Sequence, residues 1–157
     1  MKVIRRIFRF IFLLAVILLL MLVILLMCIF IPQSIEYSKY KETGVMKNGS
    51  LCISHMCEGA GGWSEKYYNS DNSVLEEADE FGVSRGIGGN AVGDVFGKVY
   101  KPINSGTSDI YVGYATHGGE SINHFELYRI EVDKDLNITY SVETINKEQF
   151  EQQYKGE

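Results

Sequence analysis

The chain is poor in cysteine, and this scarcity excludes a domain that is held together mainly by disulfide bonds. Only Cys28, Cys52 and Cys57 occur among 157 residues, whereas small secreted domains stapled by disulfides carry more. Cys52 and Cys57 could bridge only if the chain turned between them, because an extended strand would hold them too far apart. The pair is therefore either a buried thiol with a loop thiol or a small local disulfide.

Acidic side chains are absent from residues 1–31, where every charge is basic. The basic residues of this segment are Lys2, Arg5, Arg6 and Arg9. The rest of the chain carries 11 basic residues and all 20 acidic ones, so it is distinctly acidic. Nucleic-acid binding requires clustered lysine and arginine, as does docking onto anionic lipid by charge, so this composition argues against both.

Charge of either sign is absent from Phe10 to Ile31. This segment has 22 residues, and a helix of about 20 apolar residues crosses the hydrocarbon core of a bilayer. It also lacks the polar stripe of a helix that covers a soluble core. The basic cluster before it predicts a single-pass membrane protein, with residues 1–9 cytoplasmic and the C-terminal domain extracytoplasmic.

A cleaved signal peptide is the alternative interpretation of this apolar segment. Signal peptides have a shorter apolar core, of about 7–15 residues, followed by small residues at the cleavage site. Here the segment ends in bulky residues with no A-x-A-like site, and Met27 before Cys28 is a poor match to a lipoprotein cysteine. These features favour an uncleaved membrane anchor.

Residues 32–44 are polar and are predicted to form a stalk, followed by an extracytoplasmic domain at 45–142 and a polar tail at 143–157. In the domain, short β-like runs alternate with turn signals such as Asn48-Gly49. About seven strands are predicted, with 74–81 ambiguous between helix and strand. The regular spacing of turns favours an all-β antiparallel sandwich or barrel, because no repeat and no βαβ rhythm is present.

One predicted strand, at 124–132, does not show the usual alternation of polar and apolar faces. Phe125 and Leu127 alternate against Tyr128 and Ile130, so that large side chains stand on both faces.

Cys52, His55 and Cys57 have a spacing that could serve a metal ion. A zinc site would need a fourth ligand, for which only His117 or His124 is left among the histidines. In a strand, Cys52 and Cys57 would also point to opposite faces. As a nucleophile, Cys57 would need a neighbouring base, and the sequence pairs it with none. We therefore predict no metal, no cofactor and no enzymatic activity.

The order of motifs from residue 45 to residue 132 resembles the chagasin-type inhibitors of papain-like cysteine proteases. A strand leads to Gly61-Gly62-Trp63 and an aromatic strand, as in that family. Gly86-Ile87-Gly88-Gly89 looks like the family's G-x-G-G loop. A strand ending in Tyr114 and a last strand, Phe125-Glu126-Leu127-Tyr128, complete the similarity.

The resemblance implies an immunoglobulin-like β-sandwich preceded by one transmembrane helix. It also implies that three loops, at 58–63, 85–90 and 115–119, form a wedge that blocks the cleft of a cysteine protease. The binding residues implied in these loops are Gly61, Gly62, Trp63, Arg85, Gly86, Gly88, Gly89, Thr116 and His117.

Two of the three loops differ from the family pattern. The first usually reads N-P-T-T-G, and only its final glycine is found here, whereas the third usually carries R-P-W, which is absent after Tyr114. The alternative function is a cell-surface structural or interaction ectodomain without inhibitory activity. For single features, the alternatives are a buried core aromatic at Trp63 and a tight inter-strand turn at 86–89.

Overall fold

The computed structural model describes residues 2–57, 64–84, 93–115 and 121–154. Residues 1–36 and residues 37–157 form two separate compact units. The elements are α1 (Lys2–Tyr40), β1 (Gly44–Val45), β2 (Leu51–Met56), β3 (Glu65–Asn69), β4 (Leu75–Val83), β5 (Val95–Pro102), β6 (Gly106–Tyr114), β7 (His124–Val132), β8 (Ile138–Thr144) and α2 (Lys147–Tyr154).

Helix α1 is long and apolar enough to cross a membrane, by its length and composition. The large apolar side chains described between Ile7 and Ile31 are exposed all round the helix, so it has no polar stripe of the kind found on a helix that covers a soluble core. The helix continues through Pro32 to Tyr40, so most of the segment predicted as a stalk is helical. Its last turn, from Tyr37, belongs to the second unit.

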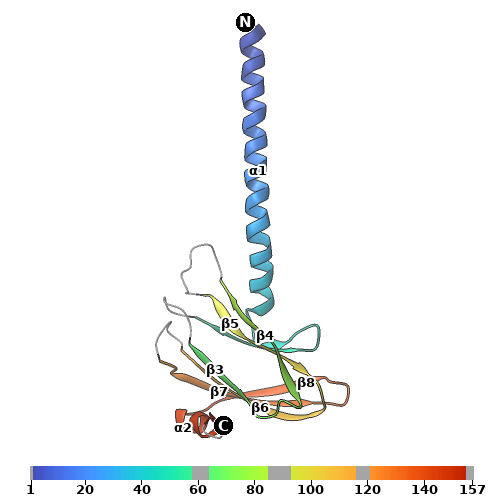
Figure 1. Ribbon diagram of the computed structural model, residues 1–157, viewed down its shortest axis with the longest axis vertical. Coiled ribbons are helices and arrows are strands. Elements are labelled where there is room, and N and C mark those ends of the chain that lie inside the picture. The colour runs from blue at the N-terminus through green and yellow to red at the C-terminus, as the bar shows by residue number, and fades with distance from the viewer. Residues whose placement is uncertain (1, 58–63, 85–92, 116–120, 155–157) are drawn as a thin grey trace. The chain divides into compact units, whose positions relative to one another are not determined.

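Two antiparallel four-stranded sheets make up most of the second unit (Figure 1). The first sheet has the strand order β1-β2-β5-β4, and the second has the order β3-β6-β7-β8. The prediction of a mostly β, antiparallel domain is confirmed, and the described part of the domain has eight strands instead of about seven. The ambiguous segment at 74–81 lies largely in strand β4, which forms one edge of the first sheet.

The core lies between the two sheets, which pack face to face as a sandwich. Alternate residues of each strand point into it, as the twofold periodicity of a strand requires. The first sheet contributes Leu51, Ile53, Leu75 and Tyr100, and the second contributes Ile110, Val112, Tyr128, Ile130, Val132 and Ile138.

Both outer faces of the sandwich are also partly covered. On the first sheet, Tyr40 from the last turn of α1 stacks on Phe81, with ring centroids 4.2 Å apart. On the second, Phe150 of α2 packs against Phe125 at 5.2 Å. Strand β7 therefore buries Phe125 and Leu127 on its outer face and Tyr128 and Ile130 on its inner face, which explains why large side chains stand on both faces of its sequence. Further along the outer face, Arg129 and Glu131 are exposed. The polar tail predicted at 143–157 contributes a covering helix.

Candidate functional site at the loop-bearing end

All the binding residues predicted from the sequence fall in three connections between strands: β2–β3, β4–β5 and β6–β7. These residues, Gly61, Gly62, Trp63, Arg85, Gly86, Gly88, Gly89, Thr116 and His117, lie outside the described residues. The residues on either side of each connection are described, and they place the points from which the three loops start.

Hydrogen bonds between backbones join the starting points of the three loops. The amide of Cys57, before the first loop, donates to the carbonyl of Asp94 at 2.8 Å. The amide of Gly93, after the second loop, donates back to the carbonyl of Cys57 at 2.7 Å. The amide of Ala115, before the third loop, donates to the carbonyl of Ser64 at 2.9 Å. The three loops therefore start from one end of the sandwich, the loop-bearing end.

The last turn of α1 reaches the same end. The hydroxyl of Tyr37 donates a hydrogen bond to the carbonyl of Gly93 at 3.0 Å. Gly93 has a φ of 84°, a conformation that suits glycine because it has no Cβ. The start of strand β5 is thus held from two sides.

Beneath the starting points of the loops, His55 of β2 is buried between the sheets. Only 6% of its surface is exposed, and its ring stacks on that of Tyr114 with centroids 3.9 Å apart. The ring of Phe96 lies 6.0 Å away, and Cys57 packs against Phe96 in the same buried cluster. This stack joins the first sheet to the second below the loops.

Glu126 of β7 gathers several polar groups beside this stack. The hydroxyl of Tyr114 donates to its Oε1 at 3.2 Å, and that of Tyr128 donates to its Oε2 at 2.7 Å. His124 Nε2 lies 3.4 Å from Oε1. A carboxylate that points between two sheets needs such partners, because an unpaired charge is costly to bury.

The electrostatics of the loop-bearing end keep His55 neutral near pH 7. Burial lowers its pKa to about 4, with a smaller opposite effect from Glu126 and a further lowering from His124. The Nε2 of His55 is buried and makes no hydrogen bond, which is uncommon for a buried polar atom. The imidazole therefore serves as a ring in the stack and adds no charge.

A second cluster of polar side chains lies where β4, an edge of the first sheet, is close to β3, an edge of the second. Burial raises the pKa of Glu65 to about 7, although a hydrogen bond from the Tyr67 hydroxyl opposes this. Lys98 Nζ lies 2.9 Å from Glu77 and 3.5 Å from Glu80. It also lies 5.4 Å from the centre of the Tyr67 ring, close enough for a cation–π contact.

The cysteine and histidine set considered for a metal is divided between two sides of the first sheet. Cys52 packs on the outer side with Tyr40 and Phe81, and burial raises its pKa to about 11. Cys57 packs with Phe96, and no disulfide joins the two cysteines. Among the described residues, no group of three His, Cys, Asp or Glu side chains is placed to hold a metal ion.

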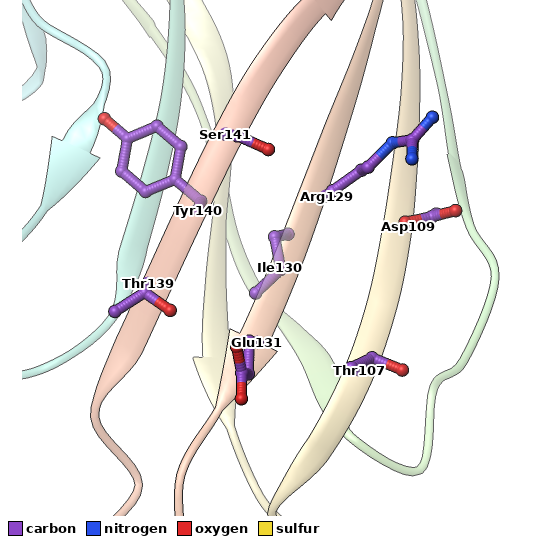
Figure 2. A pocket seen from close by; sticks show the side chains of 8 residues that line it. All are labelled: Thr107, Asp109, Arg129, Ile130, Glu131, Thr139, Tyr140 and Ser141. Atoms are coloured by element: carbon purple, nitrogen blue, oxygen red, sulfur yellow. The ribbon is translucent and has the colours of Figure 1, made fainter.

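A hollow on the second sheet is lined mainly by polar residues of β6, β7 and β8 (Figure 2). Its cation, Arg129, is engaged by Glu143 at 2.6 Å, and Asp109 stands opposite it across β6 and β7. The acidic neighbours leave little positive charge for an anionic ligand. We therefore place the candidate site at the loop-bearing end.

Comparisons with models of protein families, with curated proteins and with solved structures each returned no match. The chagasin resemblance therefore rests on the sequence motifs. Sequence reasoning considered His55 and His124 only as metal ligands and overlooked the roles of Glu126 and Glu65. The inward position of Glu126, in step with Tyr128 and Ile130, was the available signal.

Proposed function

We propose that this chain is a membrane-anchored binding module that presents three loops to a protein partner. The hydrogen bonds joining Cys57 to Gly93 and Asp94, and Ala115 to Ser64, carry the proposal. They place the starting points of three loops side by side on a scaffold of two packed sheets. Loops braced by a rigid scaffold lose little entropy on binding, and binding residues are frequently carried in this way.

The strand order supports an immunoglobulin-like sandwich. The orders β1-β2-β5-β4 and β3-β6-β7 correspond to the ABED and CFG sheets of a constant-type immunoglobulin domain. Strand β8 is then an addition beyond the last strand. In that assignment the three loops are the B–C, D–E and F–G connections.

The first partner to test is a papain-like cysteine protease. The chagasin resemblance motivates this choice, and inhibition would need only that the loops occupy the protease cleft, without a nucleophile. The apolar length of α1 and the basic residues in its first turns support an anchor with a cytoplasmic N-terminus and an extracytoplasmic sandwich. Anchoring would raise the concentration of the loops near other surface proteins.

The test is a titration of the full-length chain, in detergent or nanodiscs, against a panel of papain-like proteases. We expect inhibition at micromolar concentration or below. Replacing Gly88 and Gly89 together by Trp should weaken inhibition by roughly tenfold or more, because bulky side chains obstruct a close backbone approach. Replacing Lys134 by Ala, in the turn between β7 and β8, should leave it unchanged.

The inhibitor proposal is contradicted if the folded chain inhibits none of the proteases of the panel at micromolar concentration. The remaining function would then be an interaction ectodomain without inhibitory activity. Equal inhibition by the glycine variant and the wild-type chain would show that inhibition does not use the second loop.

A further inference from the structure

Strand β8 forms an edge of the second sheet and is exposed along most of its length. Every residue from Thr139 to Thr144 is exposed, and among the described residues only β7 pairs with it. Edge strands usually carry protection against pairing with another chain, such as short length, proline, lysine or a bulge. Strand β8 contains neither proline nor lysine, and its pairing with β7 runs from Ile138 to Thr144 without a shift in register.

Two other edges of the sandwich are protected. Strand β1 has only two residues. Strand β4 shows a register shift between Glu77 and Asp79, and it exposes the acidic side chains of Glu76, Glu77, Asp79 and Glu80. Strand β3 is shorter than β8, with five residues against seven. Strand β8 is thus the long edge with the least protection.

The pairing with β7 fixes which backbone groups of β8 point to its open edge. The amide of Ile145 donates to the carbonyl of Phe125, and the amide of Asp133 donates to the carbonyl of Asn137. These bonds continue the β7–β8 register at both ends. Because bonded pairs alternate in an antiparallel ladder, the odd-numbered residues of β8 bond to β7. The backbone groups of the even-numbered residues therefore point outward, and these residues are Ile138, Tyr140, Val142 and Thr144.

We propose that β8 pairs antiparallel with β8 of a second copy of this chain, about a twofold axis at Ser141. This register pairs the strand over its full length, from Ile138 opposite Thr144 to Ser141 opposite its own copy. All four outward-pointing residues fall in hydrogen-bonded pairs, which gives about eight new hydrogen bonds. The two second sheets would join into one continuous sheet.

In this register, the side chains of β8 in one copy are complementary to those of β8 in the other. Tyr140, 36% exposed, faces Val142, 46% exposed, and aromatic residues pair favourably with β-branched ones across strands. Figure 2 shows Tyr140 and Ser141 on opposite sides of β8. Glu143, the strand's only charge, faces Thr139, whereas an axis at Glu143 would oppose two carboxylates. A second copy therefore fits this edge without a repulsive pair.

The contact is small, since each copy contributes one strand of seven residues. It is smaller than a standard protein interface, so we expect weak association in dilute detergent. Copies that share one bilayer have a higher effective concentration, which favours the pairing. The inference is independent of the identity of the loop partner.

Cysteine cross-linking of the full-length chain in lipid vesicles tests the register. In a Cys28→Ser background, Ser141→Cys should form a disulfide-linked dimer under mild oxidation, because opposed residues of a non-hydrogen-bonded pair lie within disulfide range. Thr139→Cys and Glu143→Cys should each cross-link poorly alone and efficiently when mixed. Glu76→Cys, on the exposed edge strand β4, measures random collision.

A variant of the backbone distinguishes pairing through the β8 edge from other contacts between copies. Val142→Pro removes an N–H that points to the open edge, and proline is tolerated at such edge positions. Adding it to Ser141→Cys should abolish cross-linking with little change in thermal unfolding. Cross-linking of Ser141→Cys no faster than that of Glu76→Cys overturns the proposal. Cross-linking of Ser141→Cys that persists when Val142→Pro is added to a folded chain also overturns it. A mixture of Thr139→Cys and Glu143→Cys that cross-links no better than either variant alone does the same.

Discussion

The two ends of the sandwich are stabilised in different ways. At the loop-bearing end, a buried histidine stacks on Tyr114 between the sheets, and Glu126 accepts hydrogen bonds from Tyr114 of the neighbouring strand and from Tyr128 of its own strand. At the opposite end, the turns are tied by short polar side chains. Ser108 donates to Asn69 at 2.6 Å, and Asn69 donates to the carbonyl of Leu75 at 2.8 Å.

The two ends also differ in which segments their contacts join. At the turn end, Asp133 accepts bonds from the amides of Asp135 and Asn137, only two and four residues away. At the loop-bearing end, the joined residues, such as Cys57 and Asp94, lie far apart in the chain. The turn end therefore combines local turn bonds with the contact between Ser108 and Asn69, which lie on paired strands of one sheet. At the loop-bearing end, the stack of His55 on Tyr114 forms only when both sheets are assembled. Three sets of substitutions should break or sharpen this comparison.

The largest effect is expected from Gly97→Ala, which disrupts the frame shared by both ends. A Cβ at Gly97 would lie 1.9 Å from the carbonyl oxygen of Ile53, in the middle of the first sheet. Backbone must move to relieve that clash, so we expect a loss of at least about 3 kcal/mol in the free energy of unfolding. Thermal unfolding followed by circular dichroism measures it.

Gly49→Ala, at the turn end, is the matched control. Gly49 has a φ of 82° and open space around its Cβ position, so only the left-handed backbone is penalised, by about 1–2 kcal/mol. Equal losses for the two glycine variants would contradict the importance of the close approach at Gly97.

The second-largest effect is expected at the loop-bearing end, where His55 and Glu65 contribute to stability with opposite dependence on pH. The pKa of His55 falls from 6.5 to about 4 on folding, so its contribution to stability is present above pH 6.5 and is lost as the pH falls toward 4. The pKa of Glu65 rises from 4.5 to about 7, so its contribution is present below pH 4.5 and is lost as the pH rises through 7. The two contributions oppose each other between pH 4.5 and 6.5.

Replacing Glu65 or His55 should leave the pH dependence of stability that the other residue contributes. Between pH 6.5 and 4.5, Glu65→Gln should make the protein lose stability relative to wild type, by up to about 2 kcal/mol after allowance for the partial exposure of Glu65. His55→Phe should make it gain relative to wild type, by up to about 3 kcal/mol. Denaturant unfolding at several pH values provides the measurement. If the free energy of unfolding depends on pH in the same way for both variants and the wild-type chain, the opposed contributions of His55 and Glu65 are contradicted.

The smallest effect is expected from Ser108→Ala at the turn end. Ser108 is buried, and its hydroxyl also accepts a bond from the amide of Asp71 at 3.2 Å. Losing these hydrogen bonds should cost about 1–2 kcal/mol, with no change in pH dependence between 4.5 and 7, because a hydroxyl does not titrate there. Chemical denaturation at the same pH values checks both statements. A pH profile altered by Ser108→Ala would show that the two ends are coupled.

Much of the fold could be predicted from the sequence because its signals are local. Leu51, Ile53 and His55 stand at every second position of β2, so the period of a strand alone puts them on one side, and the structure has them facing the core. The turn at Asn48-Gly49 was readable because Gly49 adopts a positive φ. The segment at 74–81 was ambiguous, because the acidic residues that suggested a helix stand on an exposed edge strand. Its position in a sheet was decided by pairing with β5.

The candidate site could be predicted only in part. The glycine-rich connections were visible, but their common origin was not, because the bonds between Cys57 and Asp94 join separate segments. His55 was recognised as chemically notable and assigned to a possible metal set with Cys52. That set is divided because Cys52 and His55 are three positions apart in β2, and an odd separation in a strand places side chains on opposite faces.

The sequence by itself determined the apolar helix and the acidic character of the domain after it, since length, hydropathy and charge are properties of composition. It also determined the antiparallel strands, because twofold periodicity and turn residues act within a few positions. Only the tertiary structure decided where the loops start, the lowered pKa of His55 and the open edge of β8. Each of these depends on which distant strands become neighbours and exclude water from one another.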